Sequence, residues 1–323
     1  MRILFAGSPA IAIPTLLAAA DRHQVVGVLT NPPSPTGRGR ALSRTEVAAA
    51  AQAAFGPSVP IFEFQRLGSD ARSEIAALEP EILLVFAYGK IFGPKFLSLF
   101  PRGGLNVHPS ILPRHRGSSP IQQAILDRDK VTGVSVQGLA AEMDCGDIYA
   151  MERIPLDGRE GALALSETCA ALGARLAVRV LDEMERGVAC PRPQEGTPSY
   201  CAKISKEDGL VDWTRDSLEI DARIRAFEAW PMAFSFLDGQ RINLLQAEPW
   251  DGPTDSSSPD ALPGCAPGTI LGVDRKSGIV VRTGDGYLAL RRLQLAGKKA
   301  LTFREFANGA RDLAGKTLGR QGT

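Results

Sequence analysis

Short apolar runs alternate with helix-type segments through the first part of the chain. The runs that predict strands are Arg2–Ala6, Gln24–Thr30, Ile82–Phe86, Leu105–His108, Val131–Leu139 and Ile148–Ile154. The segments that predict helices are a stretch ending near Ala20, then Thr45–Phe55, Asp70–Leu78, Pro94–Phe100, Pro120–Leu126 and Gly161–Arg186. This alternation is typical of an α/β domain, so we expect a Rossmann-like, mostly parallel sheet.

The pattern changes in the last third of the chain. A helix is expected at Ser217–Phe227, and from Ala233 onward short strands alternate with glycine turns, which predicts a small β-barrel. Cys190–Pro198 is proline-rich and has no hydrophobic period, and Asp251–Gly268 is a Pro/Ser/Asp-rich insertion within the barrel. We therefore predict a catalytic-type domain over 1–189, a linker over 190–206 and a second domain, an OB-like barrel, over 207–323.

The overall composition does not indicate which class of partner the protein binds, but the distribution of charge along the chain shows two basic stretches. The chain has 323 residues and a net charge of +1, so it is long enough for two cores and has no overall basic excess. Thr269–Thr323, however, holds eleven Lys or Arg against four Asp or Glu, and the loop Asn31–Arg44 has three arginines and no acid. Both stretches are either solvated surfaces or phosphate-binding faces.

The cysteines and the amino terminus indicate a cytoplasmic protein. The five cysteines are scattered without a CxxC pair or zinc spacing, which favours a reducing compartment. MRILFAGSP runs directly into a strand and turn, and no segment resembles a signal peptide or a membrane span. The first turn has a single glycine, so the dinucleotide fingerprint is absent and a nicotinamide dehydrogenase is disfavoured.

Candidate chemistry gathers in GLNVHPSILPRHRGSSP, Gly104–Pro120. Two of the three histidines of the chain lie here. Asn106 and His108 are two residues apart on the predicted strand and therefore share a face. An amide donor beside an imidazole at the carboxyl end of a strand can hold a reacting carbonyl, although a lone histidine is more often a hydrogen-bonded core residue.

A second cluster lies in the turn EMDCGD between two predicted strands. Two aspartates flanking a glycine most often form a solvated turn. Here the two strands are expected in the sheet beside His108, so a carboxylate such as Asp144 could set the protonation of the imidazole.

Several of these stretches resemble the folate-dependent formyltransferases. NVHPSILPRHRGSSPIQ, MDCGDI, FAYGKI and FAGSP are similar to segments that this family shares. NPPSPTGRGRAL, YCAKISKEDGLVDW and IRAFEAWPMAF resemble the branch of the family that formylates the free amino group of methionyl initiator tRNA for translation initiation. The resemblance covers nearly the whole chain and is weaker over Asp251–Gly268.

The resemblance implies direct acyl transfer from 10-formyltetrahydrofolate through a tetrahedral intermediate, with no metal and no covalent enzyme intermediate. Asn106 would polarise the formyl oxygen, a protonated His108 would stabilise the oxyanion, and Asp144 would hold His108 as imidazolium. The folate pocket would be formed by Phe86, Ala87, Tyr88, Gly89, Ile91, Ser110, Ile111, Leu112, Pro113 and Met143.

The resemblance also implies contacts with initiator methionyl-tRNA. They would come from Arg38, Arg40, Arg44, Lys203, Lys206, Arg291, Arg292, Lys298 and Lys299. A monomer is compatible with all of these features. The alternatives are a formyltransferase acting on a sugar or nucleotide amine, a non-catalytic RNA-binding protein, and a folate hydrolase that releases formate.

Overall fold

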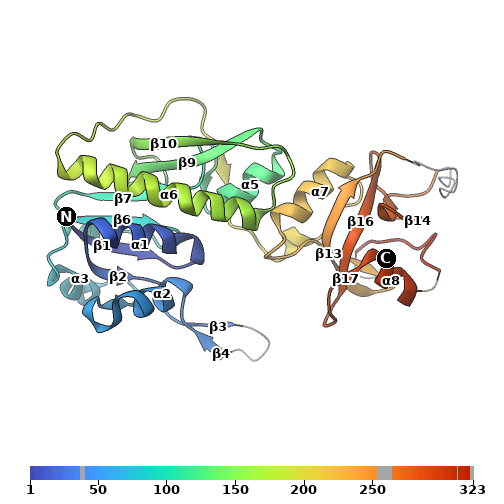
Figure 1. The fold of residues 1–323 in the computed structure, drawn as a ribbon, viewed down its shortest axis with the longest axis horizontal. Helices are drawn as coiled ribbons and strands as arrows, with labels where there is room; N and C mark the ends of the chain where they lie inside the picture. Colours follow the sequence, from blue (N-terminus) through green and yellow to red (C-terminus); the bar gives the residue numbers. More distant parts are fainter. Residues whose placement is uncertain (37–40, 253–263, 311, 321–323) are drawn as a thin grey trace. The chain divides into compact units, whose positions relative to one another are not determined.

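The computed structural model describes residues 1–36, 41–252, 264–310 and 312–320. Its largest sheet has the strand order β10-β9-β7-β6-β1-β2-β5 (Figure 1). The strands are β1 (Arg2–Gly7), β2 (Gln24–Leu29), β5 (Ile61–Phe62), β6 (Ile82–Phe86), β7 (Gly104–His108), β9 (Val131–Gly138) and β10 (Ile148–Pro155). Neighbours from β5 to β7 are parallel, and β9 and β10 are antiparallel. The predicted Rossmann-like, mostly parallel sheet is confirmed.

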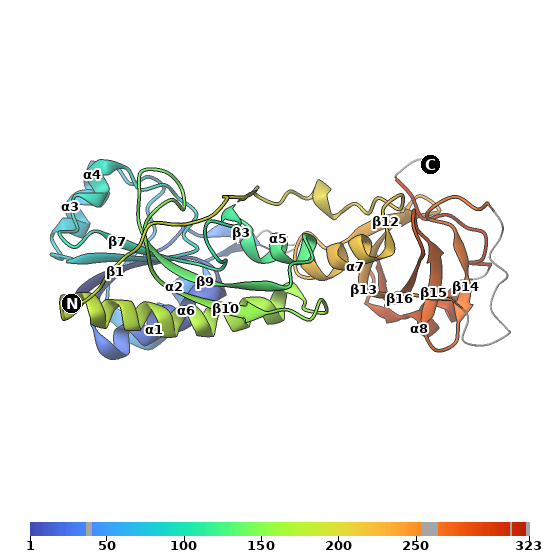
Figure 2. The same cartoon turned by 90° about the horizontal axis from the view of Figure 1, so that it is seen from above.

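Helices cover both faces of this sheet. They are α1 (Ile13–Arg22), α2 (Glu46–Phe55), α3 (Ser69–Ala76), α4 (Pro94–Leu97) and α6 (Ala162–Glu185), with single turns of 3-10 helix at Ala10–Ala12 and Gly56–Ser58. A further helix, α5 (Pro120–Leu126), lies between β7 and β9 in the sequence. Figure 2 shows α3 and α4 on one side and α1 and α6 on the other. Ile75 of α3 and Phe96 of α4 pack on buried strand residues, which makes one half of the core. On the other side α6 approaches the sheet closely at Gly173, where a Cβ would lie 2.8 Å from Val107.

The loop predicted over Asn31–Arg44 contains a short hairpin. β3 (Ser34–Thr36) and β4 (Ala41–Ser43) are antiparallel, with Ser34 opposite Ser43 and Thr36 opposite Ala41. The prediction of an irregular loop was therefore wrong for these residues, because a three-pair ladder is too short to show a period in the sequence. Arg38 and Arg40 lie outside the described residues.

The carboxyl-terminal part forms an antiparallel sheet with the order β12-β13-β16-β15-β14, and β17 pairs with β16. The elements are the 3-10 turn Glu207–Gly209, α7 (Ser217–Ala226), β12 (Phe234–Leu237), β13 (Gln240–Pro249), β14 (Ile270–Asp274), β15 (Gly278–Arg282), β16 (Tyr287–Leu295), β17 (Leu301–Thr302) and α8 (Phe303–Gly309). Near the end of the chain, Gly319 bridges to Phe236 and Thr317 bridges to Thr269, so one segment spans the two edges of the sheet. The predicted barrel-like domain is confirmed, and α8 is an element that the pattern did not predict.

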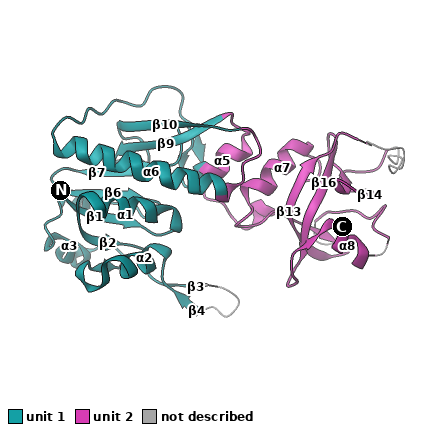
Figure 3. Ribbon diagram, viewed as in Figure 1, with its two compact units in different colours: residues 1–120, 131–156, 164–202 teal, residues 121–130, 157–163, 203–323 magenta. Residues whose placement is uncertain are grey.

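Contacts divide the chain into two compact units (Figure 3). Unit 1 comprises residues 1–120, 131–156 and 164–202, and unit 2 comprises residues 121–130, 157–163 and 203–323. The predicted linker 190–206 is thus shared between the units, and most of it packs in unit 1. Across the described ranges, no helix is both long and apolar enough to cross a membrane.

Candidate active site

The site residues of β7 stand at the carboxyl end of the sheet of unit 1. Asn106 and His108 share one face of β7, and across the antiparallel pair they face Gln137 and Ser135 of β9 in register. On its other side β7 is parallel to β6, whose carboxyl end runs into the turn Ala87–Gly89. Parallel strand ends meet at one edge, which is where α/β sheets place their ligands.

The ring of His108 is buried and its tautomer is set by one contact. His108 is 4% exposed, and its Nε2 lies 2.9 Å from the carbonyl oxygen of His115, so Nε2 must carry a hydrogen to donate. The Nδ1 atom faces Asp144 Oδ1 at 3.7 Å. Burial lowers the pKa of His108 from 6.5, and this outweighs the charge of Asp144, which acts to raise it. The resident imidazolium predicted from the sequence is therefore disfavoured, because the ring is desolvated.

The carboxylate of Asp144 collects three hydrogen bonds from separate segments. Its Oδ1 accepts from Asn106 Nδ2 at 3.2 Å and from Gln137 Nε2 at 2.9 Å. Its Oδ2 accepts from the backbone N–H of Gly117 at 2.8 Å. Asp144 has a positive φ of 55°, so the turn aims this side chain at β7 at the cost of backbone strain. The structure thus brings Asn106, His108 and Asp144 together.

The segment after β7 is held by its own hydrogen bonds. Ser110 donates through Oγ to the carbonyl of Arg114 at 2.6 Å, and its own carbonyl accepts from Ser135 Oγ at 2.7 Å. Ser135 Oγ in turn accepts from the N–H of Leu112 at 3.2 Å. Ser110, Leu112 and Pro113 are buried and Ile111 is half-buried, so this part of the predicted folate pocket is first of all a structural kink.

The turn after β6 offers backbone and apolar surface. Ala87 and Gly89 are exposed with φ of 51° and 81°. Tyr88 between them is 1% exposed, and burial raises the pKa of its hydroxyl to about 12. Phe86 is also buried, while Ile91 and Met143 are 80% and 61% exposed. Of the predicted folate residues, Ile91 and Met143 thus have the side chains most available to a ligand.

Comparison with known proteins agrees with this geometry. Residues 1–181 match the family described as "Formyl transferase", and residues 203–311 match "Formyl transferase, C-terminal domain". A methionyl-tRNA formyltransferase of Treponema denticola is 42% identical over 318 residues, which cover 97% of this chain and 98% of that protein. The chain belongs to the methionyl-tRNA formyltransferase family. The relationship predicted from the sequence is confirmed.

Solved structures share the fold of this family at low sequence identity. A methionyl-tRNA formyltransferase from Clostridium thermocellum has a TM-score of 0.53 and 18% identity, covering 78% of this chain and 95% of that one. HypX from Aquifex aeolicus in complex with tetrahydrofolic acid has a TM-score of 0.62 and 17% identity, covering 97% of this chain and 48% of that one. At such identities the likeness shows the fold alone.

Two glutamines at the site of this formyltransferase were missed in the sequence. Gln137 is 1% exposed in β9, and Gln194 lies in the proline-rich stretch whose Arg192 bridges to Ile148 of β10. Ser135 and Gln137 are polar and alternate with Val134 and Val136, so they share one face of the strand, which was a usable signal. Gln194 had no such signal, because nothing in an aperiodic segment indicates what it contacts.

The basic residues predicted to bind tRNA differ in their surroundings. Arg44 forms a bidentate ion pair with Glu63, in which Nε donates to Oε1 at 2.9 Å and Nη2 donates to Oε2 at 3.1 Å. Arg291 lies 3.0 Å from Glu248 and also donates to the carbonyls of Lys276 and Ser277. Lys203, Lys206, Arg292, Lys298 and Lys299 are exposed, and so is Arg44 despite its pair with Glu63. These five present charge to solvent, whereas Arg44 and Arg291 are already bound to carboxylates.

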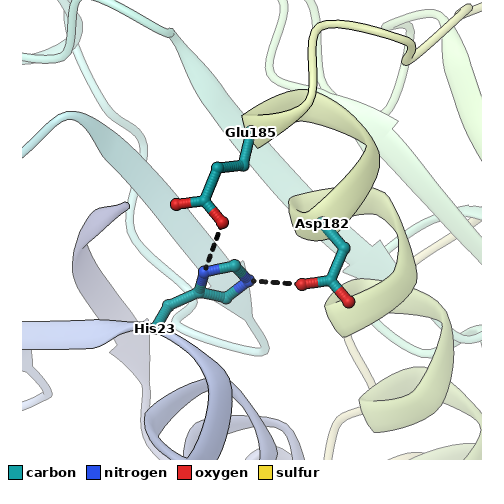
Figure 4. Close-up of side chains that lie close together, drawn as sticks. All are labelled: His23, Asp182 and Glu185. Carbon is teal, nitrogen blue, oxygen red and sulfur yellow. Dashed lines mark ion pairs between the residues drawn. The ribbon is translucent and has the colours of Figure 1, made fainter.

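A histidine and two carboxylates with ligand-type spacing lie elsewhere in unit 1 (Figure 4). His23, at the amino end of β2, has its Nε2 3.3 Å from Asp182 and its Nδ1 3.8 Å from Glu185, both on α6. Arg22 lies 3.0 Å from Asp182, and the Met1 ammonium lies 2.7 Å from Glu185. Since each carboxylate already has a cation, the cluster ties α6 to the amino edge of the sheet, away from the strand ends that carry the candidate active site.

Proposed function

We propose that this chain transfers the formyl group of 10-formyltetrahydrofolate to the amino group of methionyl initiator tRNA, which gives formylmethionyl-tRNA for translation initiation. The observation that carries the proposal is the convergence of Asn106, His108 and Asp144 at a strand end in a chain 42% identical to a methionyl-tRNA formyltransferase. Acyl transfer to an amine needs an oxyanion donor, a proton acceptor and a group that stabilises the charged acceptor. These three side chains supply them.

Asn106 is the oxyanion donor in this proposal. One hydrogen of its amide bonds Asp144 at 3.2 Å, and the other can donate to the formyl oxygen. The contribution grows as negative charge develops on that oxygen. Loss of a single such donor costs roughly 10²- to 10³-fold in kcat in enzymes of this chemistry.

His108 is the proton acceptor. With Nε2–H donated to the His115 carbonyl, Nδ1 of the neutral ring has a lone pair on the side of Asp144. Nδ1 accepts the proton that the amine loses as its nitrogen bonds to the formyl carbon. The resulting imidazolium lies 3.7 Å from Asp144, which stabilises it, and His108 returns the proton to the departing folate nitrogen.

The folate co-substrate supplies the formyl group, and the chemistry of the turn after β6 fits it. The exposed backbone of Ala87 and Gly89 offers donors and acceptors for a polar ring edge, and Ile91 and Met143 offer apolar surface beside it. We assign the remaining pocket to Phe86, Tyr88 and Ser110–Pro113, which shape it from behind.

For the tRNA we assign most of the affinity to phosphate contacts by exposed cations. Lys298, Lys299 and Arg292 in unit 2, with Lys203 and Lys206, are the residues we favour. Arg44 and Arg291 contribute less because each must leave a carboxylate first. Arg38 and Arg40 remain part of the proposal as loop contacts. We also propose that the enzyme is a monomer and that it acts in the cytoplasm.

The test is formyl transfer from 10-formyltetrahydrofolate to charged initiator methionyl-tRNA, with wild type beside His108→Ala. We expect robust transfer by wild type and a loss of about 10²-fold or more in the variant. Transfer to an aminated sugar nucleotide but not to tRNA would instead favour the alternative acceptor. Tight tRNA binding without transfer to any amine would contradict the enzyme proposal altogether.

A further inference from the structure

Gln137 places a primary amide in the buried part of strand β9. It lies on β9 between β7 and β10, opposite Asn106 on one side and Ile148 on the other, and is 1% exposed. Burying an amide is costly unless its donors and acceptor are used. Its donor is used on Asp144 Oδ1 at 2.9 Å.

Gln137 and Asn106 donate to the same oxygen. Asn106 Nδ2 lies 3.2 Å from Asp144 Oδ1, longer than the 2.9 Å contact of Gln137. A carboxylate oxygen accepts two such bonds. If the hydrogen bond from Asn106 breaks, Asp144 Oδ1 still accepts from Gln137, and Oδ2 still accepts from the Gly117 N–H at 2.8 Å.

Gln194 determines which way the amide of Gln137 points. Gln194 Nε2 donates to the carbonyls of Asp144 and Gly146 at 2.8 Å each and lies 3.3 Å from Gln137 Oε1. Its own Oε1 accepts from Arg116 Nη2 at 2.6 Å. Because a donor faces Gln137 Oε1, the Nε2 of Gln137 is directed at Asp144, and the turn that carries Asp144 is held to β8 (Arg116–Gly117).

We propose that Gln137 is a positioning residue for Asp144, which keeps the carboxylate in place while Asn106 donates its second amide hydrogen to the formyl oxygen. The proposal rests on the proposed function. Without Gln137, the Asn106 amide alone would have to hold Asp144 Oδ1 through one hydrogen and polarise the substrate through the other. Gln194 lies between the two family-matched regions, 1–181 and 203–311, so the family match itself does not include this support.

The first variant is Gln137→Met, which keeps the volume and removes the donor. We expect kcat for formyl transfer to fall roughly 10- to 100-fold, as for a misplaced catalytic group, with KM for both substrates within about twofold. Gln123→Met is the matched control, because Gln123 Nε2 donates to Asp127 Oδ1 at 2.8 Å on the surface of α5. It should keep the wild-type kcat.

Two further variants separate positioning from a structural role. In an Asp144→Ala background no carboxylate remains to be held, so adding Gln137→Met should cost less than about twofold. In Gln137→Glu, the new carboxyl group repels Asp144 when it is ionised and can donate an O–H to Asp144 when it is protonated. Its kcat relative to wild type should therefore rise as pH falls from 8 toward 6.

The outcomes are distinguishable. An inactive wild type would remove the proposed function itself. An active wild type with Gln137→Met at full kcat would overturn the positioning role. The role would also be overturned by an equal cost of Gln137→Met in the wild-type and Asp144→Ala backgrounds. If Gln137→Met does not fold, as judged by its thermal melt, the pH dependence of Gln137→Glu decides, and a flat ratio to wild type counts against the proposal.

Discussion

At the scale of single residues, the reactivity of His108 depends on which ring nitrogen carries the proton. The His115 carbonyl requires a hydrogen on Nε2, so the basic lone pair is left on Nδ1, toward Asp144. Burial lowers the pKa of the ring, and the carboxylate opposes this without cancelling it. The residue is therefore suited to take up a proton during the reaction and to release it afterwards.

Replacing Asp144 should move the acidic limb of the pH–rate profile. The charge of Asp144 raises the pKa of His108, so Asp144→Asn lowers that pKa further and the neutral ring persists to lower pH. We expect kcat at pH 7.5 to fall by about 10²-fold and the acidic limb to lie at lower pH than in wild type. Single-turnover rates from pH 5 to 8 measure both. An acidic limb at higher pH in the variant would contradict the neutral-histidine mechanism.

His23 should make the fold less stable in mild acid. Burial, with help from the Met1 ammonium, lowers the pKa of His23 below its ordinary 6.5, so the unfolded chain binds this proton more readily. Its contribution to stability is complete above about pH 6.5 and declines as the pH falls below that value. We expect the free energy of unfolding to fall less between pH 7.5 and 5.5 in His23→Gln than in wild type. Urea unfolding at the two pH values tests this, and an equal fall would contradict it.

At the scale of elements, a two-residue parallel ladder holds the catalytic segment. β8 pairs with β11 (Tyr200–Cys201), so Gly117 lies opposite Cys201 while its N–H reaches Asp144. Gly117 has a φ of 119°, and a Cβ there would lie 2.2 Å from the Cys201 carbonyl oxygen. No other residue fits without displacing β11.

Gly117→Ala should therefore reduce both stability and activity. The positive φ alone costs about 1 kcal/mol or more, and the backbone clash adds to it. We expect a kcat loss of about 10²-fold as the Gly117 N–H moves away from Asp144. Gly187→Ala is the control, because Gly187 has a φ of 71° and open space around it. It should lose only about 1 kcal/mol and keep full activity. Urea unfolding and formyl-transfer kinetics give the two readouts, and equal behaviour of the two variants would argue against the ladder.

The elements that the sequence predicted well are those with a long or uninterrupted hydrophobic pattern, or with a clear capping residue. The five residues of β6 are all buried, and α2 begins after Thr45, whose side chain accepts from the Ala48 N–H as a cap. The hairpin β3–β4 and the helix α8 were missed because each is short. Cys190–Pro198 read as a linker, yet it runs along the edge strand β10 by way of Arg192.

At the scale of the whole molecule, a nearly neutral chain carries a basic carboxyl-terminal region. The net charge is +1, while exposed Arg292, Lys298 and Lys299 lie on β16 and the turn that follows it. An uneven distribution of this kind can attract a polyanion to one unit without a high overall charge.

Removing two of these charges should weaken tRNA binding in a salt-dependent way. For Lys298→Ala/Lys299→Ala we expect the slope of log K against log salt concentration to become shallower by roughly 1.4 to 1.8, since two phosphate contacts are lost. Binding of initiator tRNA from 50 to 200 mM salt measures the slope. Lys95→Ala, which removes one positive charge from α4 of unit 1, is the control and should leave the slope unchanged. An unaltered slope in the double variant would remove this face from the proposed tRNA contacts.

By itself, the sequence determined the two fold types, the family and the cluster Asn106, His108 and Asp144. Hydrophobic patterns, turn residues and motif similarity are local properties that can be recognised in the sequence alone. The tertiary structure decided the tautomer of His108, the pairing of Gln137 with Asp144 and the support from Gln194. These depend on desolvation and on hydrogen bonds between segments far apart in the chain, and their energies exist only once the sheet has brought the segments together.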